Sequence, residues 1–410
     1  MFEWSEQHRQ IRGFVRKFVE AEIVPRREAI EFGDEPPYDV LRKMMSTFGV
    51  GEMAKAQFEK DLAREKAGEV KEKRTGRREK FSNGAADAMA MRLIPIIELS
   101  RHSPGMVTAL GVSMGLTANA IMKRGTIAQK EEYVPPLLTL EKVGAWAITE
   151  PGSGSDAFGS MKATARRDGD GYVLNGSKTF ITNGPHADTI VFICKLDEGN
   201  PPEARKIVSF ILDGDTEGLT RSKPLRKMGL HASPTGELFL EDVRVGRDRL
   251  IGEEEGSGSR QGAKATFTSE RTGVAAMALG IVERCLELSL DYARTRVQFG
   301  KRIGDFQLIQ LKLAKMQVAK SNIENLVFRM IEMEGWGLSM ELAEASACKL
   351  YCAQAAMDVA LQAVQLFGGN GYMAEYQVEQ LARDAKVLQI YGGTDEIQIS
   401  QIARSLLGPT

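Results

Sequence analysis

Residues 171–196, GYVLNGSKTFITNGPHADTIVFICKL, decide the fold class of this 410-residue chain. Short runs rich in β-branched and aromatic residues alternate here and downstream with turn-forming sequences such as NGS, TNG and LDGDTEG. The four clearest runs are Tyr172–Leu174, Thr189–Cys194, Val208–Leu212 and Leu238–Leu240. Short runs separated by Gly, Asn, Asp and Pro predict a small antiparallel β domain, which we place over residues 143–252.

The regions on both sides of this β domain are predicted to be helical. Residues 1–142 carry apolar side chains at helical spacing, and Thr108–Arg124 is Ala-, Gly- and Leu-rich, which indicates a buried helix. A Gly/Ser/Glu linker, Glu253–Gly262, opens the region 253–410. The candidate helices there are Val274–Arg296, Phe306–Glu334, Met340–Phe367 and Glu375–Tyr391. The predicted fold class is mainly α with a central β domain.

A charged insert interrupts the N-terminal region at about residues 55–85. Glu59–Lys80 holds 15 charged residues among 22, nine of them basic and six acidic. A solvated helix or surface segment explains this composition, and a docking surface for a partner is the alternative.

Composition excludes several classes of protein. Lys and Arg number 54 against 55 Asp and Glu, a balance that argues against a nucleic-acid partner. Four cysteines, Cys194, Cys285, Cys348 and Cys352, form no CxxC pair, and no His/Cys cluster predicts a metal site. No signal-peptide pattern or apolar run of about 20 residues stands out. We therefore expect a cytoplasmic protein with no membrane span and no metal.

The glycine-rich loop Pro151–Asp156, PGSGSD, is the first candidate for chemistry. It opens a β region and not a helix, so it does not fit a dinucleotide-binding fingerprint. A plain turn and a cradle for a phosphate or another ligand are both compatible with it.

The motifs around this loop resemble the acyl-CoA dehydrogenase family. The matching stretches keep the family's order over most of residues 90–410. They are WAITEPGSGSD (146–156), LNGSKTFITNG (174–184), RKMGLHASPTGELFLEDVRV (226–245), ARTRVQFGKRIGDFQLIQ (293–310), QLFGGNGYMAEY (365–376) and IYGGTDEIQ (390–398). The resemblance implies an N-terminal helical domain (1–142), a middle antiparallel β domain (143–252) and a C-terminal four-helix bundle (253–410).

The resemblance also implies FAD and an acyl-CoA substrate. In the family a carboxylate removes the Cα proton of an acyl thioester while hydride leaves Cβ for flavin N5. Hydrogen-bond donors meet the thioester oxygen, where negative charge develops. Matching positions assign one set of flavin contacts: Trp146, Ile148, Thr149, Gly154, Ser155, Phe180 and Thr182.

A second set of flavin contacts comes from a neighbouring subunit in the family. An arginine suits the FAD diphosphate because its planar fork offers charge and donors together, and glycines let backbone approach closely. The positions that match are Arg296, Gln298, Phe299, Gln307, Gln365, Gly368 and Gly369. Thr394 and Glu396 match further flavin-contacting positions. The resemblance thus predicts a homotetramer.

The catalytic base departs from the commonest family pattern. Many members carry Glu after the Tyr of the Ile-Tyr-Glu-Gly-Thr stretch, and this chain has Gly392 there. Gly392 still offers its backbone N–H to the thioester oxygen. Isovaleryl- and long-chain-type members instead place Glu before an Arg near the start of a C-terminal helix, which matches Glu270 and Arg271. We therefore predict Glu270 as the base.

Substrate contacts follow from the same comparison. Ser155, Val107, Thr108, Arg271, Tyr391 and Arg404 match substrate-binding positions. Small residues beside Thr108, including Gly111 and Gly115, favour a long or branched acyl chain, whereas close helix packing is the alternative. Thr268 stands where Asp is common, so a carrier-protein thioester stays open beside CoA. The family's loop after Val50 is replaced here, which argues against a standard fatty-acyl specificity.

Three functions remain possible on this fold. The favoured one is an acyl-CoA dehydrogenase that passes electrons to an electron-transfer flavoprotein. A flavin monooxygenase or oxidase that uses oxygen is the second. A non-catalytic subunit of a hetero-oligomer is the third, and the missing carboxylate at Gly392 motivates it.

Overall fold

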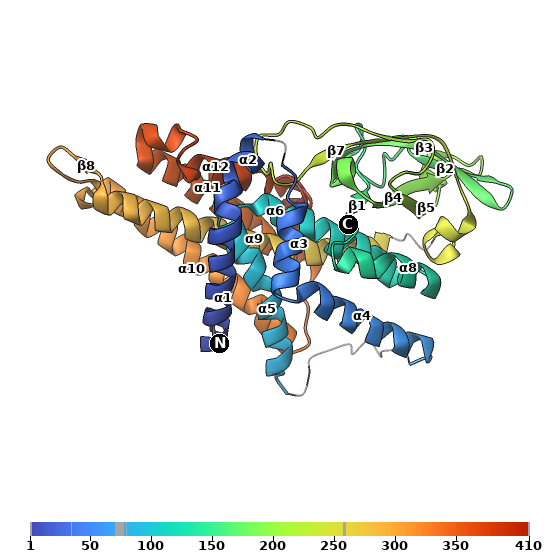
Figure 1. Ribbon diagram of the computed structural model, residues 1–410, viewed down its shortest axis with the longest axis horizontal. Coiled ribbons are helices and arrows are strands. Elements are labelled where there is room, and N and C mark those ends of the chain that lie inside the picture. Colours follow the sequence, from blue (N-terminus) through green and yellow to red (C-terminus); the bar gives the residue numbers. More distant parts are fainter. Residues whose placement is uncertain (1, 34, 70–77, 79, 257–259, 409–410) are drawn as a thin grey trace.

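A computed structural model describes residues 2–33, 35–69, 78, 80–256 and 260–408, and for 260–270 it describes the backbone alone. Helices from the beginning and the end of the chain pack together, and a β-sheet lies at one end of the elongated molecule (Figure 1). This arrangement confirms the predicted fold class, with helical regions before and after a central β domain. The domain boundaries at residues 142 and 252 stay predictions.

The N-terminal region is a set of helices joined by short turns. Ser5 and Thr126 cap two of them, because each side-chain hydroxyl accepts a backbone N–H three residues later, from His8 and Gln129. The α-helices are α1 (Glu6–Phe18), α2 (Arg27–Phe32), α3 (Tyr38–Thr47), α4 (Val50–Lys66), α5 (Asn83–Ser100), α6 (Pro104–Leu110), α7 (Asn119–Arg124) and α8 (Ile127–Leu138). The π-helical turns η1 (Val19–Ile23) and η3 (Gly111–Ala118) extend α1 and join α6 to α7.

The segment Pro104–Arg124 corrects the expectation that no apolar run approaches the length of a membrane span. It is one continuous helical path of 21 residues with a mean hydropathy of 1.4 in its most apolar window. About 44% of that window is buried inside the protein, and a buried core helix passes the same test of length and composition. The absence of a membrane span stays a prediction.

The charged insert is helical at its beginning. Helix α4 reaches Lys66 and buries Phe58 and Leu62 against the N-terminal region. Residues 70–77 and 79 of the insert lie outside the described residues. Where the chain is described again, the Arg78 guanidinium donates to the carbonyls of Glu334 and Gly335 near the end of α10.

Seven strands form the sheet of the middle region. They are β1 (Gly144–Ala147), β2 (Thr164–Asp168), β3 (Gly171–Thr182), β4 (Thr189–Leu196), β5 (Ile207–Asp213), β6 (Leu219–Arg221) and β7 (Thr235–Val245). Their order along the sheet is β1-β4-β2-β3-β7-β6, and β5 lies outside this order and pairs with β4. Most pairs are antiparallel, as predicted, but β1–β4 and β2–β4 are parallel. Strands β1, β2 and β6 were not among the predicted runs.

The NGS sequence is a bulge within a strand and not a turn between strands. It lies inside β3, where the register with β7 shifts between Leu174 and Gly176. Gly176 has φ of 144°, and a Cβ there would lie 2.6 Å from the Ala163 Cβ, so only glycine fits. The same residue that looks like a turn signal in the sequence therefore bends a long strand.

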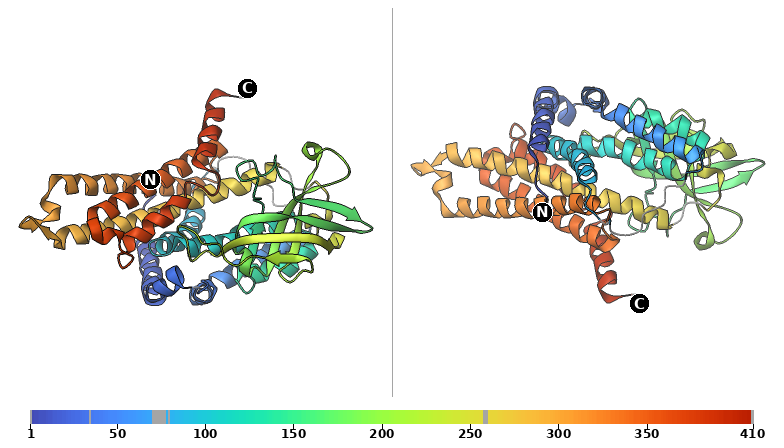
Figure 2. Two further views of the ribbon diagram at one scale, coloured as in Figure 1. Left: turned by 90° about the horizontal axis from the view of Figure 1, so that it is seen from above. Right: turned by 90° about the horizontal axis from the view of Figure 1, so that it is seen from below.

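The C-terminal region is built from long helices. They are α9 (Arg260–Thr295), α10 (Gln307–Gly335), α11 (Leu342–Phe367), α12 (Gln377–Val387) and α13 (Asp395–Leu407), with a small hairpin of β8 (Val297–Gln298) and β9 (Lys301–Arg302). Helix α9 begins inside the predicted linker. Helix α13 projects from the body of the molecule and carries the chain toward its C-terminus (Figure 2).

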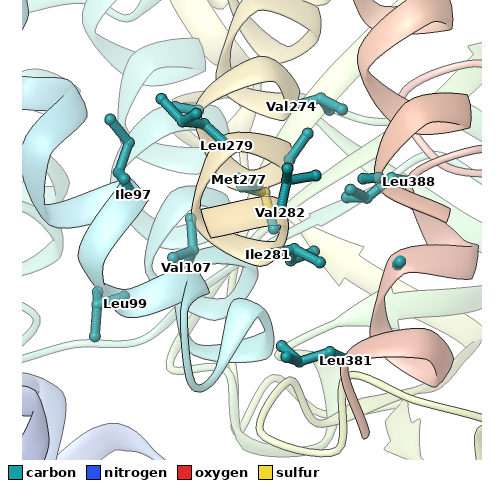
Figure 3. Packing of buried hydrophobic residues seen from close by; sticks show 14 of the residues in the cluster. Ile97, Leu99, Val107, Val274, Met277, Leu279, Ile281, Val282, Leu381 and Leu388 are labelled. Atoms are coloured by element: carbon teal, nitrogen blue, oxygen red, sulfur yellow. The ribbon is translucent and has the colours of Figure 1, made fainter. Parts of the chain in front are cut away.

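Helix α9 is the central element of the core. Figure 3 shows Val274, Met277 and Val282 of α9 between α5 and α6 on one side and α12 on the other. Gly280 allows the closest approach, since a Cβ there would lie 2.2 Å from the Ile97 carbonyl oxygen of α5. The N-terminal and C-terminal helical regions thus share one apolar core.

Candidate active site

The loop after β1 is a turn that backbone hydrogen bonds hold together, and its outer residues are exposed to solvent. The Glu150 N–H donates to the Ser153 carbonyl (3.1 Å), and the Ser153 N–H donates to the Glu150 carbonyl (3.0 Å). The Ser153 hydroxyl donates to the Asp156 carbonyl at 2.7 Å. Gly154 and Ser155 are exposed, and a Cβ at Gly154 would meet nothing within 4 Å. The turn therefore leaves room for a ligand on its outer face.

Strand β3 lies beside the exit of β1 and presents an aromatic ring there. The Thr179 N–H donates to the Thr149 carbonyl at 2.9 Å. The next residue, Phe180, has φ of 58° and a 67% exposed side chain, so its ring stands away from the sheet. Strands β1 and β3 contact each other. The predicted flavin contacts carried by these two strands and the β1 exit are Trp146, Ile148, Thr149, Phe180 and Thr182.

Asn183, which the sequence analysis did not select, joins this edge to the N-terminal helices. It is fully buried with φ of 64°, and its amide donates to the carbonyls of Ala109 and Gly144, both at 2.9 Å. Its carbonyl oxygen accepts the hydroxyl of Tyr38 at 3.0 Å. Asn tolerates a positive φ better than most residues, which is the signal in the TNG sequence that points to it.

The turn at Gly392 and Gly393 is held through its carbonyl oxygens. The Gln398 amide donates to both carbonyls, at 3.1 and 2.8 Å, and the ammonium of the fully buried Lys349 donates to the Gly393 carbonyl at 2.8 Å. Both glycines have positive φ, 61° and 90°, a conformation that disfavours a side chain. Thr394 then caps α13, and Glu396 lies exposed in its first turn.

Tyr391 connects this turn to the predicted acyl pocket. Its hydroxyl lies 3.5 Å from the Thr108 hydroxyl of α6 and 3.3 Å from the Met277 sulfur of α9. Val107 is buried beside Thr108. The structure thus brings three of the predicted substrate-binding residues together from two regions of the chain.

An open face continues from these residues along the π-helical turn η3. Gly111 and Gly115 are exposed, and among the described residues a Cβ at either position would meet nothing within 4 Å. Close packing within this chain therefore does not explain these small residues. Such π-helical turns occur frequently at functional sites.

Arg271 lies next to the Gly392–Gly393 turn. Its side chain is buried, its Nη1 donates to the Ser346 hydroxyl at 2.9 Å, and its Nη2 would lie 3.5 Å from a Cβ on Gly393. The preceding residue, Glu270, belongs to α9, but its side chain lies outside the described residues. Arg404 lies on α13 with an exposed side chain.

The second set of predicted flavin contacts lies at the end of the folded molecule opposite the sheet. The β8–β9 hairpin and the end of α11 meet there, where Tyr292 stacks on Phe367 with ring centroids 4.1 Å apart. The sheet lies at the opposite end (Figures 1 and 2). Phe299 is 93% exposed. The exposed members of this set are Arg296, Gln298, Phe299, Gln307, Gln365, Gly368 and Gly369.

Comparisons with known proteins agree with this fold over its whole length. Models of the acyl-CoA dehydrogenase N-terminal, middle and C-terminal domains match residues 50–141, 145–243 and 256–407. An acyl-CoA dehydrogenase of Bacillus subtilis is 38% identical over 99% of each chain. A mitochondrial isovaleryl-CoA dehydrogenase of Oryza sativa subsp. japonica is 34% identical over 98% of this chain and 92% of its own. The structure of a butyryl-CoA dehydrogenase from Megasphaera elsdenii superposes with a TM-score of 0.84, at 33% identity over 100% of both chains.

The match to the middle-domain model, together with a β region between two helical regions that share one core, places this fold among the flavoenzymes. The chain belongs to the acyl-CoA dehydrogenase family. It is an FAD-dependent oxidoreductase that dehydrogenates an acyl-CoA at a CH–CH bond.

The residues at the sheet edge fit FAD. A Cβ at Gly154 would meet nothing within 4 Å, and the exposed ring of Phe180 offers an apolar surface on β3. Open space likewise surrounds Gly368 and Gly369, where a Cβ would meet nothing within 4 Å. Gly154 thus leaves the backbone accessible to the flavin ring of FAD, and Gly368 and Gly369 leave it accessible to the diphosphate and adenosine of FAD.

Proposed function

We propose that Glu270 is the base that removes the Cα proton of the acyl-CoA substrate. The bound FAD supplies the hydride acceptor for this reaction. The Gly392 N–H donates to the thioester oxygen and so stabilises the negative charge that develops there. Bound substrate would exclude water from the Glu270 carboxylate, and loss of water favours the protonated form of a carboxylate. The carboxylate thereby becomes a stronger base toward the Cα proton of the substrate.

One observation carries this proposal. Arg271 is buried against the Gly392–Gly393 turn, so the helix that contains Glu270 reaches that turn one residue later. Gly392 itself cannot accept a proton, and its positive φ suits a residue without a side chain. This contact of α9 with the turn supports a base from α9 in place of a carboxylate at position 392.

The test is the Glu270→Gln enzyme, which keeps the shape of the side chain and removes the base. We expect turnover to fall by about 10²–10⁴-fold, while FAD content and the spectral change on binding an enoyl-CoA product stay as in the wild type. Glu217→Gln, at an exposed position between β5 and β6, is the matched control and keeps full turnover. An unchanged turnover in Glu270→Gln would exclude Glu270 as the base.

The acyl group is proposed to be long or branched. The open face at Gly111 and Gly115 beside Thr108 supports room for such a chain. An anaerobic titration with thioesters from butyryl to palmitoyl, plus isovaleryl and isobutyryl, tests this. Bleaching of the flavin band by butyryl-CoA alone would overturn the proposed chain preference.

The electron acceptor is proposed to be an electron-transfer flavoprotein, by family resemblance, in a cytoplasmic enzyme. Reduced, product-bound enzyme should then react slowly with oxygen. Fast reoxidation by oxygen would favour the oxidase alternative.

The enzyme is further proposed to be a homotetramer in which a neighbouring subunit completes each flavin site. Two observations support this. The two sets of flavin contacts lie at opposite ends of one chain, and the second end carries exposed apolar side chains such as Phe299 and Leu308.

A further inference from the structure

A buried ion pair lies directly under the flavin-facing edge of the sheet. The Lys178 ammonium is 2.8 Å from Glu150 Oε1, with Lys178 fully buried and Glu150 6% exposed. Taking two charges out of water costs free energy that their mutual attraction often does not recover. A buried apolar pair would fill the same space, so this ion pair calls for a functional explanation.

The pair connects three segments of backbone. The Glu150 carboxylate accepts the N–H groups of Lys162 (2.7 Å) and Ala163 (3.0 Å), where the chain returns from the glycine loop. The Lys178 ammonium also donates to the Ile148 carbonyl at 3.0 Å. The exit of β1, the far end of the loop and the middle of β3 are therefore held by one cluster of hydrogen bonds.

The proposed flavin contacts flank this cluster. Thr149 immediately precedes Glu150, and its carbonyl accepts the Thr179 N–H. Phe180 follows two residues after Lys178, with a positive φ that costs free energy and persists only where its surroundings impose it. A hydrogen-bonded ion pair is a stronger constraint on such a backbone than apolar packing, because it fixes direction as well as distance.

We propose that Glu150 and Lys178 are positioning residues that hold Thr149 and Phe180 in the flavin-binding geometry and that their opposed charges tune the reduction potential of the bound flavin. This inference rests on the proposed flavin contacts of Thr149 and Phe180. Both members are buried within the protein, so their role is assigned to positioning and not to contact with the reacting atoms. A charge close to the flavin ring changes the reduction potential of the flavin. Removal of one partner should therefore raise the potential if a positive charge remains and lower it if a negative charge remains.

The experiment measures FAD release on dilution of the holoenzyme, and the flavin reduction potential at pH 8, for Glu150→Gln, Lys178→Met and the double variant. We expect each single variant to weaken FAD binding at least about tenfold, and the double variant to lie closer to the wild type than either single variant does. The potential should rise in Glu150→Gln, where the cation remains, and fall in Lys178→Met. A purely structural role predicts no opposed shifts.

Arg12→Met is the matched control. It breaks a buried ion pair of the helical core, in which the Arg12 guanidinium lies 2.7 Å from both Glu98 and Glu283, and it should leave FAD binding and the potential unchanged. If single variants of the sheet pair release FAD no faster than Arg12→Met, the positioning role is wrong. Should Lys178→Met fail to fold, Glu150→Gln against this control decides the question alone.

Thr149→Ala and Phe180→Ala separate this inference from the function on which it rests. If neither changes FAD affinity or the flavin spectrum, the proposed flavin contacts themselves fail. If both do and the ion-pair variants do not, only the positioning role fails.

Discussion

His231 joins the middle region to the N-terminal helices, and its protonation should control part of the enzyme's stability. It lies between β6 and β7. Its Nδ1 is 2.7 Å from the Glu31 carbonyl of α2, and its Nε2 is 2.9 Å from the Lys227 carbonyl. A carbonyl oxygen only accepts, so both ring nitrogens carry hydrogen only in the imidazolium form. Arg383 of α12 contacts the Glu31 carboxylate from the other side, at 3.3 Å.

The charges around His231 fix the sign of the pH dependence. A hydrogen bond to the Glu31 carboxylate raises the pKa of His231 to about 9, against the effect of burial. A pKa raised in the folded state contributes stability that is fully present below about pH 6.5 and is lost as the pH rises through 9. Burial raises the pKa of neighbouring Asp384 to about 7 and lowers that of Lys227 to about 8. Both contributions persist in a variant at position 231, so the difference between the two proteins isolates His231.

The magnitude follows from the shift. A rise from 6.5 to about 9 corresponds to about 3 kcal/mol for a fully desolvated group, and we halve this to about 1–2 kcal/mol because His231 is partly exposed. His231→Gln should therefore unfold about 1–3 °C lower than the wild type at pH 6.5. This gap should close by pH 9.5, where the wild type has lost its imidazolium.

Thermal unfolding of the holoenzyme, followed by circular dichroism at half-unit intervals of pH, measures this difference. His186→Gln is the control. Burial lowers the pKa of His186, so its difference from the wild type should not vary above pH 7. A His231→Gln difference of equal size at pH 6.5 and 9.5 would refute the charged-imidazole reasoning.

Two further predictions concern packing and assembly. Gly280→Val should destabilise the fold by about 2–3 kcal/mol in denaturant unfolding, because its Cβ would meet the Ile97 carbonyl oxygen, whereas Gly273→Ala on the same helix, with nothing within 4 Å, should cost nothing. Leu308→Asp, at a 75% exposed position on α10, should shift the molar mass in light scattering from tetramer toward smaller species and release FAD, and the control Met53→Asp on α4 should not. A tetrameric Leu308→Asp would contradict this placement of the interface.

Local sequence was enough to predict the long helices. Helices α10 and α11 are rich in Ala, Leu, Gln and Lys and free of proline, so propensity and packing favour the same structure. Strand β2, TARRD, was missed because Thr164 is its only residue that favours a strand. It forms because β3 and β4 on its two sides supply the hydrogen bonds.

The candidate site shows the same division between local and tertiary information. Motifs selected Thr149, Phe180 and Gly392, whose roles depend on position along the chain. They did not select Glu150 or Lys178, since a Glu and a Lys near turns are ordinarily solvated. Only the folded structure shows that both are buried. A pattern of residue types cannot reveal burial of a charge, because that burial depends on segments distant in sequence.

The order of motifs along the chain also does not predict whether one flavin site is formed by a single subunit or by two. The ends of α9 and α11 that precede Arg296 and Gly368 meet at the Tyr292–Phe367 stack, whereas the sheet that carries the other proposed contacts lies toward the opposite end of the molecule. A single FAD that contacts both sets must then lie between two copies. If the proposed flavin contacts and homotetramer are both correct, cofactor binding requires assembly. Loss of FAD and loss of the tetramer should therefore occur together, at the same protein concentration, when the holoenzyme is diluted.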